Sequence, residues 1–170
     1  MLSSHMLEHT ANPLGALREW ARVLKPGGTL LLIVPHLDGT FDHRRPVTTM
    51  THLVDDLDAK RGEDDLTHAE EILALHDSRR DFGLHTITFR ERVYNNAELR
   101  SVHHHVFDTR LAVEAVEPAG LVLRAVPLEP YHVVVVARKV GGSDATTRLS
   151  AHALIAVLKR SPFPTDRAKA

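Results

Sequence analysis

Residues 12–35, which read NPLGALREWARVLKPGGTLLLIVP, decide the fold class. Their first half predicts a helix, because Asn12 is a good N-cap residue and Pro13 suits the first helical position. The apolar residues of one helical face are Leu14, Leu17, Ala21 and Leu24. A Pro-Gly-Gly sequence at 26–28 ends the helix, which we therefore expect to span 12–24.

The second half of this stretch predicts a strand. Residues 29–34 form an apolar run that follows the Gly-Gly turn and ends at Pro35. A short run of this kind is typical of a strand that is buried on both faces. A helix that leads through a glycine turn into such a strand indicates an α/β fold with a parallel sheet.

A polar and charged segment, 36–92, follows this strand and contains two predicted helices. One begins near Thr48 or Thr49 and runs to about Leu57, and the other covers 67–76. Because the segment is inserted between strands of an α/β sheet, we expect it to form a helical cap over the functional site.

The rest of the chain predicts one more helix and two strands. Asp108 caps the helix, and Gly120 suits the position that ends it. The strands cover 121–126 and 131–137, and their short connection makes them antiparallel neighbours. We therefore expect one domain over 1–140. A Gly-Gly-Ser linker at 141–143 begins the remainder, 141–170, which carries a small helix over 149–158 and a basic tail.

The composition excludes several classes of protein. The chain has 170 residues and a formal charge of -1, so no strong field attracts nucleic acid or an acidic membrane. It has no cysteine, which excludes disulfides, thiolate metal sites and a cysteine nucleophile. No apolar run approaches the roughly 18 residues that cross a bilayer. We therefore expect a cytoplasmic protein with neither nucleic acid nor membrane as a partner.

Two motifs together resemble a known signature. The first is SHMLEH at 4–9, and the second is RVLKPGG at 22–28, with Asn12-Pro13 between them. At this separation they resemble class I S-adenosylmethionine-dependent methyltransferases of the type 11 group, in which they mark the end of strand four and the approach to strand five. The strands over 119–139 look like strands six and seven. The resemblance implies a partial Rossmann-like sheet of strands 5, 7 and 6 with the end of strand 4, and a helical insertion after strand 5.

The middle of the chain resembles a narrower subgroup of these enzymes, which is associated with surface-polysaccharide or sugar modification. The shared features are FDHRRP at 41–46, Thr48 and Thr49, His68 with Glu71, and VHHHVF at 102–107. This resemblance implies a small or glycan-related acceptor for the methyl group.

The chain also departs from the family pattern. Class I methyltransferases hold S-adenosylmethionine on a glycine-rich turn after strand one and on an acidic residue after strand two. Neither feature is present, because the sequence begins where strand four would be finishing. We therefore expect a truncated gene product or an inactive remnant, with weak cofactor binding at best. The alternative is a non-catalytic binding module whose open sheet edge pairs with another chain or with a second copy.

Two groups of candidate ligand-binding residues lie where strands would end. The resemblance places Ser4, His5 and Met6 beside the cofactor, whereas a purely structural interpretation has 7–9 fix the turn and cap the next helix. Asp42, His43, Arg44 and Arg45 follow strand five and are predicted to bind substrate, since guanidinium groups bind phosphate or carboxylate. The alternative is a solvated loop whose charges pair with the acidic stretch 55–58.

Histidines form the last candidate group. In an extended segment His103 and His105 would point to one side and His104 to the other. Together with His68, or with His36 and His43, they could form a metal site, a general base or a substrate-binding wall. The spacing is generic, so we predict no metal ligand. We assign His103 or His105 as general base for a hydroxyl acceptor, and His36 and His68 to the substrate site.

Overall fold

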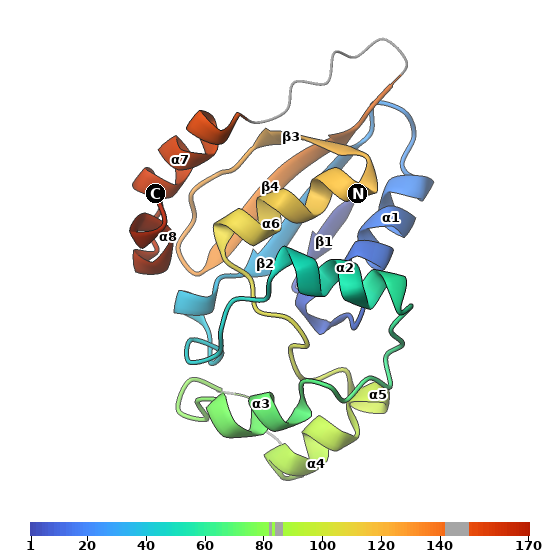
Figure 1. Ribbon diagram of the computed structural model, residues 1–170, viewed down its shortest axis with the longest axis vertical. Helices are drawn as coiled ribbons and strands as arrows, with labels where there is room; N and C mark the ends of the chain where they lie inside the picture. The colour runs from blue at the N-terminus through green and yellow to red at the C-terminus, as the bar shows by residue number, and fades with distance from the viewer. Residues whose placement is uncertain (82, 84–86, 142–149) are drawn as a thin grey trace.

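A four-stranded mixed sheet lies at the centre of the computed structural model, which describes residues 1–81, 83, 87–141 and 150–170 (Figure 1). The strands, in their order across the sheet, are β1 (Leu2–Ser4), β2 (Thr29–Pro35), β4 (His132–Lys139) and β3 (Leu121–Ala125). β1 is parallel to β2, whereas β4 is antiparallel to both β2 and β3. The predicted α/β class and the antiparallel pairing of the last two strands are confirmed.

Eight α-helices and three 3-10 helices belong to the described part of the chain. The α-helices are α1 (Pro13–Val23), α2 (Met50–Asp58), α3 (Ala69–Leu75), α4 (Phe89–Tyr94), α5 (Asn96–Leu99), α6 (Thr109–Val116), α7 (Ala151–Arg160) and α8 (Pro164–Ala168). The 3-10 helices are η1 (Leu7–His9), η2 (Leu37–Gly39) and η3 (Glu117–Ala119). None of the described helices is long and apolar enough to cross a membrane.

The predicted start and end of the first helix are confirmed in α1. The Asn12 side chain accepts a hydrogen bond from the Gly15 backbone N–H at 2.8 Å, which caps the helix. Gly27 has a φ of +74°, a conformation that glycine adopts without strain, and its N–H donates to the Lys139 carbonyl. This turn therefore places the start of β2 next to the end of β4.

β2 is buried less evenly than the sequence predicts. Leu30, Leu32 and Val34 are fully buried in the main core, on the face that α1 and α6 cover (Figure 1). Leu31 and Ile33, on the other face, are only partly buried. The prediction of a strand buried on both faces is therefore confirmed for one face only. The other face of β2 is partly exposed in the described structure.

Helices α3, α4 and α5 lie beyond the carboxyl ends of β1 and β2, apart from the sheet (Figure 1). They have a small core of their own, which consists of Ala69, Ile72, Val93 and Val102. The sequence pattern predicts α2 and α3 but not α4 and α5. The start of α4 carries a detectable signal, because Thr88 and Glu91 form a capping box.

The C-terminal helices pack against the body of the protein. Leu154 and Leu158 of α7 belong to the main core, and the Phe163 ring stacks on His36 at a centroid distance of 3.7 Å. His36 Nε2–H donates to the buried Asp166 carboxylate at 3.1 Å. His36 is therefore fully buried beneath this tail, and a substrate contact through it stays a prediction. The predicted linker residues 142 and 143 lie outside the described residues.

The Asp166 carboxylate holds this contact together. Burial raises its pKa, but hydrogen bonds from His36, Ser161 and Thr109 outweigh burial and leave the pKa below its ordinary value. A carboxylate that is ionised at neutral pH accepts these bonds more strongly than a neutral acid would. The tail thus closes over His36 through a charged and fully buried acceptor.

Candidate functional site

A buried arginine organises the loop that follows β2. The Arg45 side chain is only 1% exposed. Its guanidinium donates to Glu71 Oε1 at 2.8 Å, Asp42 Oδ1 at 3.0 Å, the His103 carbonyl at 2.9 Å and the His104 carbonyl at 2.9 Å. Arg45 therefore connects the loop to α3 and to residues 103–105, called the histidine segment below. These hydrogen bonds all go to other groups of the protein, and a substrate contact through Arg45 stays a prediction.

Asp42 and His103 form a buried carboxylate–histidine dyad. Asp42 Oδ2 lies 2.5 Å from His103 Nδ1. Burial alone would raise the pKa of Asp42, but the hydrogen bond and charge of His103 and the charge of Arg45 together lower it. An ionised carboxylate only accepts hydrogen bonds, so His103 must donate through Nδ1. Nε2 is then the nitrogen of His103 that can accept a proton.

The dyad lines a small cavity, and helices α3 and α4 contribute part of its wall. The cavity has a volume of about 210 Å³. Its wall consists of His9, Phe41, Asp42, Ile72, His76, Asp81, Phe89, Arg92, Ser101, Val102 and His103. Aromatic and charged side chains thus surround a space for about seven water molecules, or for one polar group of a ligand.

A second buried carboxylate lies beside the dyad. Glu8 is fully buried, and neither of its carboxylate oxygens has a hydrogen-bond partner in the described structure. Its Oε1 lies 3.6 Å from His5 Nδ1 and 3.8 Å from His9 Nε2. Burial is the main reason why the pKa of Glu8 is raised. The sequence favours a role for Glu8 in fixing the turn, and it does not reveal an acid that can carry a proton at the edge of this site.

His9 connects Glu8 to the dyad. Its Nδ1–H donates to the Val102 carbonyl at 3.0 Å, and its ring meets the His103 ring edge-on at 4.7 Å between centroids. Burial, reinforced by the charge of His103, lowers the pKa of His9 to about 4. His9 is therefore neutral at physiological pH, with Nε2 directed toward the carboxyl group of Glu8.

The candidate cofactor residues lie on the open surface at the carboxyl end of β1. Ser4, His5 and Met6 are all exposed. His5 has a φ of +52°, and its N–H donates to the Ile33 carbonyl, which fixes the turn out of the strand. These residues can contact a ligand from outside, and their contact with a cofactor stays a prediction.

His43 and Arg44 share one acidic partner. His43 Nε2 lies 3.0 Å from Asp77 Oδ2, and Arg44 Nη2 donates to the same oxygen at 3.1 Å. The alternative expectation, that the charges of this loop pair with the acidic stretch 55–58, is therefore wrong for His43 and Arg44, which contact Asp77 instead. Both side chains remain partly exposed, at 26% for His43 and 43% for Arg44, and can still meet a ligand.

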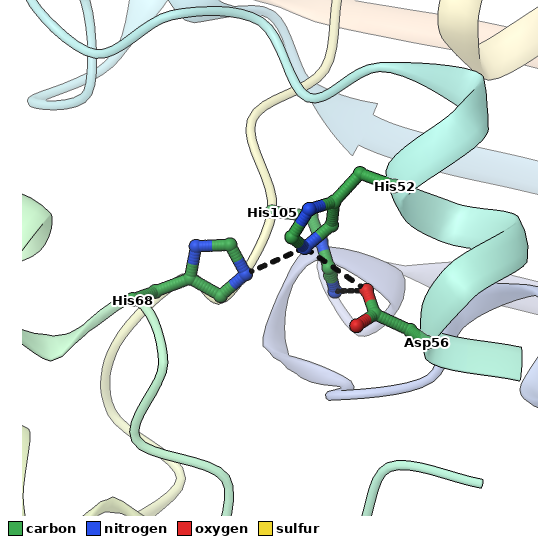
Figure 2. A group of neighbouring side chains, drawn as sticks. All are labelled: His52, Asp56, His68 and His105. Atoms are coloured by element: carbon green, nitrogen blue, oxygen red, sulfur yellow. Dashed lines mark hydrogen bonds and ion pairs between the residues drawn. The ribbon is translucent and has the colours of Figure 1, made fainter. Parts of the chain in front are cut away.

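His103 and His105 do not point to the same side, as an extended segment would require. The chain bends here, because the N–H groups of His104 and His105 both donate to the Glu8 carbonyl, at 2.8 and 3.3 Å. His103 joins the dyad, whereas His105 joins His68 in a second cluster with His52 and Asp56 (Figure 2). One short segment therefore supplies two separate groups of polar side chains.

The N-terminal part of this structure carries a family match. Residues 1–32 match the family model Methyltransf_11, which describes a methyltransferase domain. No curated protein and no solved structure matched the chain. The matched range contains β1, the exposed turn Ser4–Met6, Glu8, all of α1 and the start of β2.

The dyad lies outside the matched range, on the chain that joins β2 to α6. The match therefore supports a relation to methyltransferases through the part of the sheet that borders the site. It says nothing about Asp42, Arg45 or His103, whose roles rest on their geometry alone.

We predict that Arg45→Lys destabilises the protein far more than Arg44→Lys. A lysine ammonium cannot reproduce the fork that reaches Asp42, Glu71 and two carbonyls, so buried acceptors lose their donor. The expected loss in free energy of unfolding is about 3 kcal/mol for Arg45→Lys, and at most about 1 kcal/mol for the partly exposed Arg44. Urea denaturation followed by circular dichroism measures both. Equal effects of the two substitutions would show that Arg45 is not the centre of the site.

Proposed function

We propose that this chain forms the acceptor-binding part of an S-adenosylmethionine-dependent methyltransferase, with His103 as general base toward a hydroxyl group of a small or glycan-related acceptor. The observation that carries the proposal is the buried Asp42–His103 dyad in the wall of a cavity. Its wall includes His9, which follows β1 in η1, and Phe41 and Asp42, which lie in the loop after β2. The cavity therefore borders chain segments that leave the carboxyl ends of these strands, where open α/β sheets bind their ligands.

The order of the strands supports this assignment. The sheet has the strand order and directions expected for the second half of a class I methyltransferase sheet. In that comparison β1 corresponds to strand four, β2 to strand five, β4 to strand seven and β3 to strand six. That fold is characterised by a terminal strand inserted antiparallel beside strand five, as β4 is inserted beside β2. The match over residues 1–32 covers all of β1 and the first part of β2.

The described residues fit one side of a cofactor site. Ser4, His5 and Met6 are exposed at the end of β1, where they can border S-adenosylmethionine. The glycine-rich turn that binds S-adenosylmethionine in this family follows a strand and opens a helix. The described residues contain no such turn: Gly27 and Gly28 precede β2, and the Gly27 N–H donates to the Lys139 carbonyl. The bound cofactor would supply a methyl group that its sulfonium already activates, and other residues must complete its site.

The dyad accounts for the proton chemistry of such a reaction. An acceptor hydroxyl in the cavity would donate to His103 Nε2, and its proton would pass to that nitrogen as the oxygen becomes a nucleophile. Asp42 holds the imidazole through Nδ1 and stabilises the imidazolium that forms. Arg45 keeps Asp42 ionised and in place. A base placed in this way typically contributes a factor of about 100 to 10,000 in rate.

We predict that His103→Gln removes this contribution. In the protein that carries this sequence, the rate of transfer of a labelled methyl group from S-adenosylmethionine to hydroxylated sugars should fall by a factor of about 100 or more. The KM for the acceptor should change little, since glutamine keeps the cavity polar. His152→Gln, in the exposed start of α7, is the matched control and should leave the rate unchanged. Full activity of His103→Gln, or no transfer by the unsubstituted protein, would contradict the proposal.

A second candidate function, a binding module that pairs through its sheet edge, is favoured by the surface of β1. This strand pairs only with β2 in the described structure. Leu2, the first residue of this edge strand, is 65% exposed, and open strand edges with apolar residues invite pairing. The partner we propose for this edge is a second copy of the chain.

Sedimentation velocity tests the second candidate. The 170-residue chain should form dimers as its concentration rises, and Leu2→Lys should keep it monomeric because a charge opposes edge pairing. Val54→Lys, at another exposed apolar residue, is the control and should leave dimers intact. A monomer at every concentration would exclude pairing through β1.

A further inference from the structure

Four potential metal ligands converge from three segments of the chain (Figure 2). His52 and Asp56 stand one turn apart on α2, so that both project from the same face of the helix. His68 precedes the first turn of α3, and His105 lies on the segment between α5 and α6. From the sequence, His68 is assigned to the substrate site, Asp56 belongs only to an acidic stretch, and His52 is not singled out.

The distances match those within a tetrahedral zinc site. His52 Nε2 lies 3.1 Å from His68 Nε2 and 3.2 Å from Asp56 Oδ2. His105 Nε2 lies 3.7 Å from the same Asp56 oxygen, and all four ligand atoms lie within 4.8 Å of one another. Zinc bonds of about 2.0–2.1 Å in a tetrahedron separate the ligand atoms by about 3.3 Å. Small side-chain movements would therefore complete the coordination.

Hydrogen bonding accounts for only part of this cluster, namely the contact between His52 and His68. Asp56 is 4% exposed, and its Oδ2 has no hydrogen-bond partner in the described structure, despite its approach to His52. His105 is 1% exposed, its Nδ1 also has no partner, and its Nε2 makes one long contact of 3.4 Å to the Ala11 carbonyl. Buried polar atoms normally have hydrogen-bond partners, so Asp56 Oδ2, which faces His52 and His105 without such a bond, indicates a missing ligand.

The type of ligand follows from the donor atoms. Three imidazoles and one carboxylate suit zinc, whereas magnesium and calcium prefer ligand sets made of oxygen alone. The carboxylate offsets part of the charge of the ion, and Arg61 lies on the far oxygen of Asp56, at 3.8 Å, rather than among the ligand atoms. No acidic residue beyond Asp56 is required.

We propose that His52, Asp56, His68 and His105 bind a structural zinc ion. Four protein ligands close the coordination sphere, as structural zinc sites do. The ion would join α2, the start of α3 and the histidine segment, and would thereby fix His103, two residues from its ligand His105. This inference is independent of methyl transfer, because it concerns the position of the segment and not its chemistry.

Zinc binding to the untagged 170-residue protein, first stripped of metal with a chelator, tests the proposal. Calorimetry should show one zinc ion per chain, and cobalt at the same site should give the intense visible absorption of tetrahedral coordination. Zinc should also raise the melting temperature. His52→Ala and His68→Ala replace partly exposed ligands, so the fold should survive. Each should weaken zinc binding by at least about 100-fold.

Two control variants locate the ion. His152→Ala changes an exposed histidine of α7 and should leave zinc affinity unchanged. His9→Ala changes the other candidate cluster, formed by Glu8, His9 and His103, and should also leave it unchanged. The proposal is overturned if no zinc binds, if His52→Ala and His68→Ala bind as tightly as the unsubstituted protein, or if only His9→Ala loses the ion.

Discussion

The buried guanidinium of Arg45 is the interaction on which the site depends. An unpaired charge in the interior would be prohibitively unstable, so the fold must bring acceptors to it from every side. Those acceptors come from the loop after β2, from α3 and from the histidine segment. By satisfying one cation, the protein fixes the relative position of three parts of the chain that are far apart in the sequence, and it also keeps Asp42 ionised beside His103.

The histidine segment has two roles because its backbone bends where it contacts the Glu8 carbonyl. Because one carbonyl accepts from both His104 and His105, the backbone cannot run straight, and His103 and His105 enter different surroundings. His103 meets a carboxylate that is ionised, which suits a proton acceptor. His105 meets two imidazoles and a carboxylate oxygen that accepts no hydrogen bond, which suits a metal ion. A ligand bound at either end of this short segment would therefore restrain the other end.

The sequence predicts the parts of the fold whose causes are local. The cap at Asn12, the Gly27 turn and the apolar runs of β2 and β4 act within a few residues, and the structure confirms each of them. The sequence also indicates His103 or His105 as a base, and this stays a prediction. It did not identify Glu8, Asp42 as the partner of His103, or the grouping of His52 with His105, because these contacts join distant segments. The open second face of β2 was missed for the same reason: burial depends on what else packs there.

The central claim is that Asp42 holds His103 with Nδ1 protonated and Nε2 ready to accept a proton. Nitrogen-15 NMR of the imidazole groups tests this directly, at a pH where His103 is neutral, because the two tautomers give distinct long-range proton–nitrogen patterns. We expect His103 to carry its proton on Nδ1, and Asp42→Asn to lose that strict preference. A neutral His103 with its proton on Nε2 would contradict the account, since that nitrogen could not then act as the base.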